Sequence, residues 1–430
     1  MAKMKDSGVK WIGEIPESWE IYSLKHLFQM FAGGDIDEDD FSDEYTEQTP
    51  YPIYSNSLEN NGLFGYTSKY RFSGKTFTVT GRGDVGKAIV RNDEYYPIVR
   101  LLVCVPILKD DTRYFTYCVN SADLLGEQTA MAQLTTQKLG INKVPRPSIK
   151  EQQVIASFLD NKVKKIDKIL NELRNQVDIL NKYKKSLVTE TVTRGLNPNA
   201  ELKDSGVDWI GMIPRNWEYR KLKYILKNNC NNLKVGPFGS ALSGDDFKDE
   251  GYWVYNQRCV LDKNFDNTDA YVNEQKFNEL IGFKVFPDDI LITTRGTIGK
   301  VAIVPKNAKT GILHPCLIRF VVDNNLISNQ LVELIFNESS IITEQIYRQS
   351  NATTIEVIYS YNLKELLLPI IPIEEQQQIV EYLEKKRREI DNLISNKQMQ
   401  IEKMEKYKKS LIYEYVTGKK RVKGAEELYG

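Results

Sequence analysis

The feature that most constrains this chain of 430 residues is an internal duplication. Residues 5–20 (KDSGVKWIGEIPESWE) recur as residues 203–218 (KDSGVDWIGMIPRNWE), with twelve of the sixteen positions identical. Residues 151–192 likewise recur as residues 375–416, and both stretches begin with Glu-Gln-Gln. The stretch between the two repeated segments is 26 residues longer in the second copy. Such self-similarity predicts one structural unit present twice, with retained ends and diverged middles.

The second repeated segment of each copy predicts a long helix. Apolar residues recur at alternating steps of three and four, which is the heptad seam of a coiled coil. The second seam is less regular, because Arg387, Lys397 and Lys408 interrupt it. The expected seam positions are Leu159, Val163, Ile166, Leu170, Leu173, Val177 and Leu180 in the first helix, and Leu383, Ile390, Ile394, Ile401, Met404 and Leu411 in the second.

The ends of these helices also carry sequence signals. Ser148 and Glu151 have the spacing of a capping box. Gly195 and Gly418 stand where glycines commonly end helices. Because a helix with an apolar stripe needs a partner, and two-fold pseudo-symmetry favours opposite directions, we expect the two helices to form an antiparallel coiled coil.

This symmetry predicts where the N-terminus lies. Residues 203–218 follow the first helix directly, so residues 5–20 should pack at the end of the second helix. The chain would then be quasi-circular, with residue 11 close to residue 416.

Each diverged middle mixes strand-like and helix-like patterns. The runs FTVTG (77–81) and DILITT (289–294) predict short buried strands that end in turns. We therefore predict an α+β fold with two such domains and two long helices. The expected segments are an N-terminal segment with the first domain (1–147), a helix (148–195), a linker, repeated opening segment and second domain (196–371), a helix (372–418) and a C-terminal tail (419–430).

One short pattern survives in both middles. Arg82 to Lys87 and Arg295 to Lys300 both read Arg-Gly-x-x-Gly-Lys after an expected strand. Two glycines within four residues indicate a tight turn, and backbone amides beside cations suit a phosphate or a base edge. A plain hairpin with solvated charges explains the pattern equally well. It is not a nucleotide-binding P-loop, because Ala88 stands where Ser or Thr would hold magnesium.

Polar clusters in comparable places of the two copies add candidate DNA contacts. Asn, Gln and Arg are the side chains that pair bidentately with base edges, although ordinary polar loops have the same composition. The candidate DNA-binding residues are Arg82, Lys87, Asn56, Thr136 and Gln137 in the first copy, and Arg295, Lys300, Gln257, Arg258, Thr353 and Thr354 in the second.

Composition narrows the function further. Lys and Arg number 58, as do Asp and Glu, so the chain has no net basic charge. A protein that binds DNA alone usually has a basic excess, so this balance argues against DNA binding unless the charge is segregated on the surface or a partner subunit supplies much of the phosphate contact. Five scattered cysteines and two histidines offer little for a metal site or a catalytic triad. With no run of about 20 apolar residues and no signal peptide, we expect a cytoplasmic protein.

No catalytic motif is evident in either copy. An adenine methyltransferase would need a glycine-rich cofactor turn and an Asn-Pro-Pro-Tyr-like loop, and the one Asn-Pro, at Asn197, lies in the linker. Helicase motifs and a nuclease metal cluster are equally missing. The sequence therefore favours recognition over catalysis.

The architecture resembles the specificity subunit of type I restriction-modification enzymes. The resemblance is carried by the repeated D-S-G-V-x-W-I-G-x-I-P-x-x-W-E openings and by the helix beginnings V-P-R-P-S-I-K-E-Q-Q and L-P-I-I-P-I-E-E-Q-Q. It covers about residues 5–418. These two patterns occur together twice, which makes the resemblance specific.

The resemblance implies that each middle is a target-recognition domain that reads one half of a bipartite, asymmetric DNA site. The coiled coil would set the spacer length and dock two methyltransferase subunits. Those subunits would bind S-adenosylmethionine, and motor-nuclease subunits would use ATP and Mg²⁺. This chain would itself hold no cofactor and no catalytic residue.

Two alternatives to this interpretation stay open. A coiled-coil scaffold that binds only proteins would have the same seam, but no reason for two cationic glycine turns. A single-chain enzyme acting on nucleic acid would need the catalytic motifs that are missing. Independently of the family, two diverged readers on one symmetric frame should read two different half-sites, whereas equal readers suit a palindrome.

Overall fold

The computed structural model describes residues 3–122, 133–228, 232–238, 240–349 and 357–423. The chain divides into two compact units, residues 1–174 with 399–430, and residues 175–398. Each unit therefore contains one diverged middle together with a stretch of both long helices. We describe each unit by itself.

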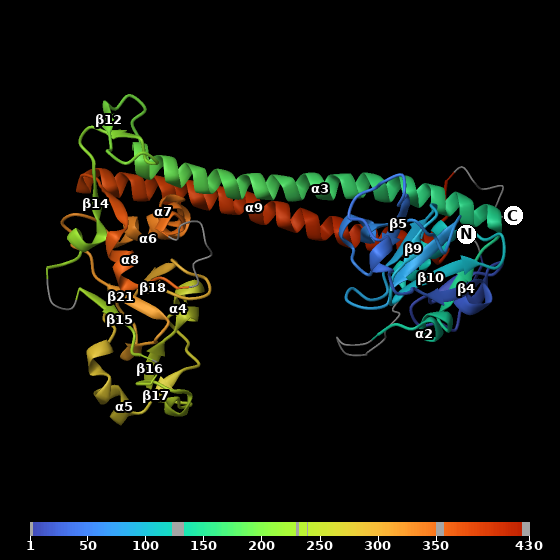
Figure 1. Ribbon diagram of the computed structural model, residues 1–430, viewed down its shortest axis with the longest axis horizontal. Helices are drawn as coiled ribbons and strands as arrows, with labels where there is room; N and C mark the ends of the chain where they lie inside the picture. Colours follow the sequence, from blue (N-terminus) through green and yellow to red (C-terminus); the bar gives the residue numbers. More distant parts are fainter. Residues whose placement is uncertain (1–2, 123–132, 229–231, 239, 350–356, 424–430) are drawn as a thin grey trace. The chain divides into compact units, whose positions relative to one another are not determined.

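The first unit is built around a four-stranded antiparallel sheet of order β4-β10-β7-β8 and a three-stranded sheet of order β6-β5-β9 (Figure 1). Helix α1 packs on β7 and β8, where the Asn120 side chain bonds both the amide and the carbonyl of Ala88. The elements are β1 (Met4–Asp6), β2 (Glu14–Pro16), β3 (Glu20–Ser23), β4 (Phe28–Ala32), β5 (Tyr51–Tyr54), β6 (Leu63–Thr67), β7 (Thr76–Thr80), β8 (Ala88–Arg91), β9 (Tyr96–Pro97), β10 (Leu101–Pro106), α1 (Thr112–Ser121), α2 (Thr136–Gly140) and β11 (Lys143–Arg146).

The second unit repeats this plan. Its sheets have the orders β15-β21-β18-β19 and β17-β16-β20, and Asn337 of α6 bonds the backbone of Val301 as Asn120 bonds Ala88. The elements are β12 (Leu202–Asp204), β13 (Met212–Pro214), β14 (Glu218–Lys221), β15 (Leu233–Val235), β16 (Tyr252–Tyr255), α4 (Gln257–Leu261), β17 (Tyr271–Val272), α5 (Glu274–Glu279), β18 (Ile290–Thr293), β19 (Val301–Ile303), β20 (Gly311–Leu313), β21 (Leu317–Phe320), α6 (Asn329–Glu338), α7 (Ile341–Gln349), α8 (Ser360–Glu365) and β22 (Leu367–Ile370).

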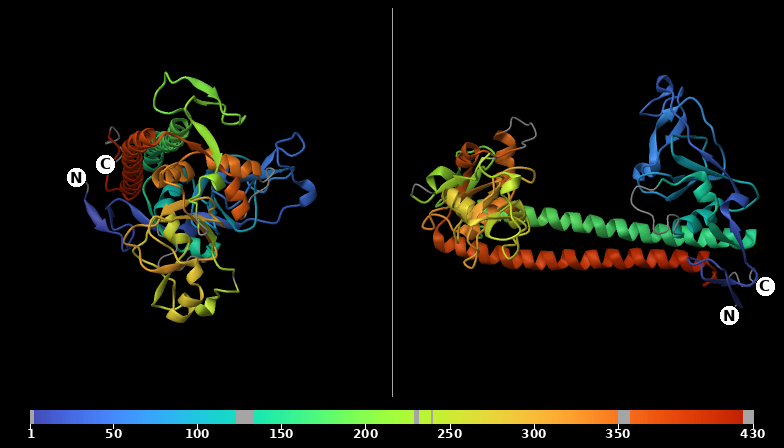
Figure 2. Two further views of the ribbon diagram at one scale, coloured as in Figure 1. Left: turned by 90° about the vertical axis from the view of Figure 1, so that its left-hand side faces the viewer. Right: turned by 90° about the horizontal axis from the view of Figure 1, so that it is seen from below.

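The two long helices are α3 (Ile149–Arg194) and α9 (Ile373–Val416). Within each unit, a stretch of α3 lies beside a stretch of α9 (Figure 1, Figure 2). In the first unit, ion pairs join Asp167 to Lys408 at 2.6 Å and Arg174 to Glu405 at 2.7 Å. The partner number falls as the α3 number rises, so the helices are antiparallel. The predicted α+β fold with an antiparallel coiled coil is confirmed.

The seam is buried as the heptad pattern predicts. All thirteen predicted seam residues are buried or half-buried. Two of the cations that interrupt the second seam have acidic partners at the helix surface, Glu338 for Arg387 at 3.0 Å and Asp167 for Lys408. The irregular positions are thus accommodated by ion pairs rather than by apolar packing.

The Glu-Gln pair at the start of each long helix makes equivalent structural contacts in both units. Gln152 is fully buried, and its amide bonds the Asp111 amide, the Asp110 carboxylate and the Pro147 carbonyl at 2.8–3.0 Å. Gln376 makes the corresponding bonds to the Ser328 amide and to two carbonyls at 2.7–2.8 Å. Each glutamine thereby ties the start of a long helix to the cap of a domain helix.

The neighbouring glutamate fastens the repeated opening segment to the same point. The indole of Trp19 donates to Glu151 at 3.1 Å, and that of Trp217 donates to Glu375 at 2.9 Å. Glu151 also accepts from Ser148 at 2.8 Å, which confirms the predicted capping box.

The same tryptophans receive the end of the other long helix. Gly418, at φ +72°, lies against Trp19, and Gly195, at φ +74°, lies against Trp217. In the first unit, the Tyr413 hydroxyl donates to the Ile12 carbonyl at 3.1 Å. The N-terminal segment therefore packs at the end of α9, and the predicted quasi-circular arrangement is confirmed.

We predict that Gln376→Ala destabilises the second unit while Gln377→Ala does not. The first change removes the buried side-chain amide that bonds the half-buried Ser328 amide and two carbonyls, which costs about 1–3 kcal/mol. Gln377 is exposed and bonds only Glu381. Urea unfolding followed by tryptophan fluorescence should show a lower midpoint for Gln376→Ala alone. Equal midpoints would contradict this role of the buried amide.

Candidate nucleic-acid interface

The two Arg-Gly loops, Arg82 to Lys87 and Arg295 to Lys300, are hairpin loops whose shape is fixed by hydrogen bonds. They join β7 to β8 and β18 to β19, the paired inner and outer strands of each main sheet. In the second, the Thr293 hydroxyl donates to the Thr297 carbonyl at 2.6 Å and accepts from the Lys300 amide at 3.0 Å. Thr80 makes the equivalent bonds to Asp84 and Lys87. A strand-terminal threonine therefore fixes the shape of each loop.

The loop glycines have the backbone conformation that the sequence pattern predicts. Gly83 and Gly86 lie at φ +73° and +84°, and Gly296 and Gly299 at +63° and +78°. Residues with side chains rarely adopt such positive values. The expected tight turns are confirmed.

Two of the predicted polar residues hold these loops from the side. The Asn56 oxygen accepts from the Gly81 amide at 2.8 Å, while its nitrogen donates to the Val99 carbonyl at 3.1 Å. Gln257, at the same place after β16, donates to the Arg295 carbonyl at 3.0 Å. The sequence predicted these two residues as direct DNA contacts, whereas the structure shows their amides bonded to the backbone, where they position the loop.

In each unit a third segment lies beside the Arg-Gly loop. Together with the loop and the segment that carries Asn56 or Gln257, it forms one edge of the domain. The Leu134 amide donates to the Gly81 carbonyl at 3.0 Å, which brings Thr136 and Gln137 beside the first loop. The Ile358 amide donates to the Thr294 carbonyl at 2.9 Å in the second unit. Thr136 and Gln137 thus correspond to Ser360 and Tyr361. The predicted counterparts Thr353 and Thr354 lie outside the described residues.

The predicted cations differ in how available they are. Arg82, Lys87 and Arg295 are exposed. Lys300 is half-buried, and its ammonium donates to the Asn337 carbonyl at 2.9 Å. Arg258 is exposed and forms an ion pair with Asp269 at 3.1 Å. The geometry therefore favours Arg82, Lys87 and Arg295 as the groups that face a ligand.

The structure adds Arg100, which sequence reasoning missed. Arg100 is exposed and has φ +72°, unusual for a residue with a side chain. A Cβ atom on Gly81 would overlap its carbonyl oxygen, so Arg100 lies against the first loop. No pattern could have revealed it, because the corresponding residue of the second unit is a cysteine, Cys316.

Positive charge at these edges comes from arginine and lysine. Near the second loop, burial lowers the pKa of His314 and raises the pKa of the Cys316 thiol. At neutral pH both groups are therefore uncharged, and Arg295 dominates the local field.

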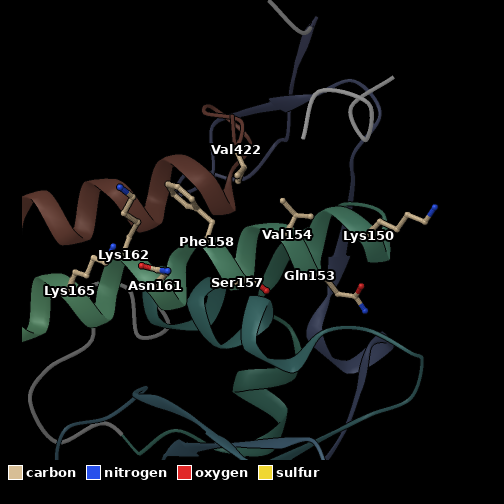
Figure 3. A pocket seen from close by; sticks show the side chains of 9 residues that line it. All are labelled: Lys150, Gln153, Val154, Ser157, Phe158, Asn161, Lys162, Lys165 and Val422. Atoms are coloured by element: carbon tan, nitrogen blue, oxygen red, sulfur yellow. The ribbon is translucent and has the colours of Figure 1, made fainter. Parts of the chain in front are cut away.

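A groove of about 810 Å³ runs along the first turns of α3 in the first unit (Figure 3). Val154 and Phe158 of the helix and Val422 of the tail form its apolar part, with lysines around it. A second hollow, of about 670 Å³, lies in the second unit at the corresponding place and includes Tyr382, the counterpart of Phe158. The lining of the first groove is Lys150, Gln153, Val154, Ser157, Phe158, Asn161, Lys162, Lys165 and Val422.

Other kinds of site have little support in the part of the chain that the structure describes. Within those ranges, no three Asp, Glu, His or Cys side chains gather as a metal site would require. The four described cysteines, Cys104, Cys118, Cys259 and Cys316, are free thiols. Of the described helices, none has the length and apolar character needed to cross a bilayer.

The fold and the two edges define a duplicated recognition module linked by paired helices. The model of the family described as Type I restriction modification DNA specificity domain matches residues 16–178 and again residues 214–403. These two matches cover most of the chain and coincide with the two copies. The chain belongs to this family.

Individual relatives agree with this assignment. The chain is 26% identical to the putative type I restriction enzyme MjaX specificity subunit of Methanocaldococcus jannaschii, over 96% of each chain. It is 24% identical to the type I restriction enzyme EcoBI specificity subunit of Escherichia coli, over 58% of this chain and 52% of that one. A solved chain from work on complex assembly and conformational transition of the type I R-M system has a similar fold, with a TM-score of 0.67, 12% identity and coverage of 94% and 98%.

We predict that Thr293→Val loosens the second loop. Valine keeps the shape but loses both hydroxyl bonds, so the Lys300 amide should exchange its hydrogen roughly 5- to 150-fold faster, for a loss of about 1–3 kcal/mol. Thr297→Val is the matched control, because that exposed residue contributes its carbonyl and not its hydroxyl to the loop. Hydrogen exchange resolved to this amide tests the prediction, and equal rates in both variants would refute it.

Proposed function

We propose that this chain is the DNA sequence-recognition subunit of a type I restriction-modification complex, and that each unit reads one half of a bipartite, asymmetric site. The observation that carries the proposal is an edge built twice, with equivalent threonine and strand-end contacts and with a side-chain amide bonded to the loop backbone in each unit. Thr80, Asn56 and Leu134 form the first edge, and Thr293, Gln257 and Ile358 form the second.

The side chains on this shared frame support two different half-sites. Arg82 and Arg295 occupy the same place, whereas Arg100 corresponds to Cys316 and Gln137 to Tyr361. DNA sequence is read by protein side chains at the edges of the bases, whereas contacts to the DNA phosphates only position the protein. A conserved frame with exchanged side chains therefore suits one docking geometry and two specificities.

A non-catalytic role agrees with the family. S-adenosylmethionine, ATP and Mg²⁺ are proposed to belong to partner subunits and not to this chain. Methyltransferase partners that also contact phosphates would explain how a chain with 58 cationic and 58 acidic residues binds DNA.

The repeated grooves favour two copies of one methyltransferase partner. Phe158 and Val422 line the first hollow, and their counterparts Tyr382 and Pro198 line the second, which is otherwise formed mainly by the end of α3 and the linker after it. Motor-nuclease subunits would complete the proposed complex. A protein-only scaffold explains the grooves, but it gives no reason for two exposed arginine loops pinned by buried threonines.

Arginine substitutions should separate the two half-sites. Arg82→Ala is expected to weaken recognition of one half-site and Arg295→Ala that of the other, each by about 1–3 kcal/mol or roughly 5- to 150-fold. Arg215→Ala is the control, because this exposed arginine pairs with Glu201 away from both edges. The measurement is binding of the methyltransferase complex to duplexes with one half-site scrambled at a time. Unchanged affinity in both loop variants would contradict the assignment.

The helices should set the spacer between the half-sites. One heptad inserted after Arg174 in α3 and one before Met399 in α9 keeps the seam in phase. It adds about 10.5 Å to each helix, at 1.5 Å per residue, which corresponds to about three base pairs at 3.4 Å each. Methylation mapping should therefore reveal the same half-sites with a spacer longer by about three base pairs.

A heptad in only one helix is the matched control for this experiment. It leaves a seven-residue stretch, with its two seam positions, without a partner helix and should abolish modification. An active double insertion with the original spacer would rule out the helices as the ruler.

A further inference from the structure

The second unit carries large aromatic side chains that the recognition frame alone does not explain. Phe238 is 83% exposed, Tyr361 is 64% exposed and Tyr359 is 53% exposed. Single exposed aromatics are common on protein surfaces, so their positions decide whether they matter.

These three residues belong to segments that lie at the same end of the sheet as the Arg295 loop. Along that end, the Gly236 amide donates to the Leu317 carbonyl at 3.0 Å, and the Thr294 amide donates to the Cys316 carbonyl at 3.0 Å. The Ile358 amide then donates to Thr294, as described above. The segments after β15, after β18 and before α8 therefore lie in one row (Figure 1).

Each aromatic residue sits within three positions of a bonded residue in this row. Phe238 follows Gly236 by two residues, and Arg295 follows Thr294 directly. Tyr359 follows Ile358 directly, with Tyr361 two residues further on. The segments that carry the aromatic residues thus lie on either side of the segment that carries Arg295.

The local backbone holds these rings in place. A Cβ atom on Gly236 would overlap the His314 carbonyl, so this segment lies tightly against β20 and β21. The ring of Pro237 fixes the φ angle of that residue. The Phe238 carbonyl accepts from the Ala241 amide at 2.8 Å. The rings of Tyr359 and Tyr361 stack with centroids 5.5 Å apart and planes 6° apart. Rigid rings lose little entropy on binding.

The first unit has polar residues at the corresponding places. The Gly33 amide donates to the Leu101 carbonyl at 2.8 Å, as Gly236 does to Leu317. Asp35 therefore corresponds to Phe238, and Thr135 and Gln137 correspond to Tyr359 and Tyr361. At these three positions the two edges share a frame but carry different chemistry, although exposed Val99 adds an apolar group to the first edge.

We propose that Phe238, Tyr359 and Tyr361 read the second half-site through apolar contact with thymine methyl groups in the major groove, while the first edge reads its half-site by hydrogen bonds. This inference rests on the proposed function. The thymine methyl is the apolar group that a base pair presents in that groove, and side chains such as Phe contact it. Arg295, on the segment between theirs, would hold the duplex against the rings.

The test uses the full chain assembled with its methyltransferase partner and duplexes that carry the mapped site. Phe238→Ala and Tyr361→Ala should each weaken binding about tenfold, and should reduce discrimination against a scrambled second half-site only. Phe238→Leu should keep most of the affinity, because it keeps an apolar side chain. Phe286→Ala is the control, since this 44% exposed phenylalanine precedes β18 at the other end of the strand. Unchanged melting temperatures verify folding.

Uracil in place of thymine tests the chemistry directly, because uracil lacks the methyl group. Uracil in the second half-site should weaken wild-type binding about tenfold, with no further loss in Phe238→Ala, and uracil in the first half-site should have no effect. Uracil without effect in the second half-site would overturn the proposal. So would alanine variants that bind within twofold of wild type, or that lose affinity equally on every sequence.

The outcomes also separate this inference from the function on which it rests. A wild-type complex that binds no bipartite site refutes the proposed function. A complex in which Arg295→Ala loses the second half-site but Phe238→Ala does not refutes the aromatic reading alone.

Discussion

The structure depends on the buried junction at the start of each long helix. There, Glu151 bonds the indole of Trp19, and the fully buried Gln152 bonds the backbone beside α1. The second copy makes the same junction with Glu375 and Gln376. Because buried polar groups are costly to leave unpaired, each junction accepts one arrangement of opening segment, domain and helix. The end of the other helix packs on the same tryptophan, so every unit needs both copies of the sequence.

This junction lets the recognition edges diverge. The sheets, the strand-terminal threonines and the loop glycines preserve the backbone, whereas residues outside these contacts are free to change. The exchanges of Arg100 for Cys316 and of Gln137 for Tyr361 fall at such positions. A frame held by buried bonds and an edge held only by its backbone fit two units that share a fold while they carry different side chains.

Much of this could be predicted from the sequence. The duplication, the heptad seam, the capping box at Ser148 and the glycines at the helix ends each depend on contacts between residues close in the chain or on strict periodicity. The repeat then supplied the antiparallel pairing and the N-terminal closure through symmetry. The Arg-Gly loops could also be anticipated, because their pattern occurs in both copies.

Only the tertiary structure decided how these polar residues are used. Asn56 and Gln257 bond the backbone, and Lys300 is held by Asn337, because strands distant in sequence bring those partners within reach. Arg100, Phe238 and Tyr361 join the edges through long-range pairing that leaves no repeated motif. Local periodicity therefore determined the frame, since its contacts follow the chain, while the composition of each reading edge arose from non-local strand order.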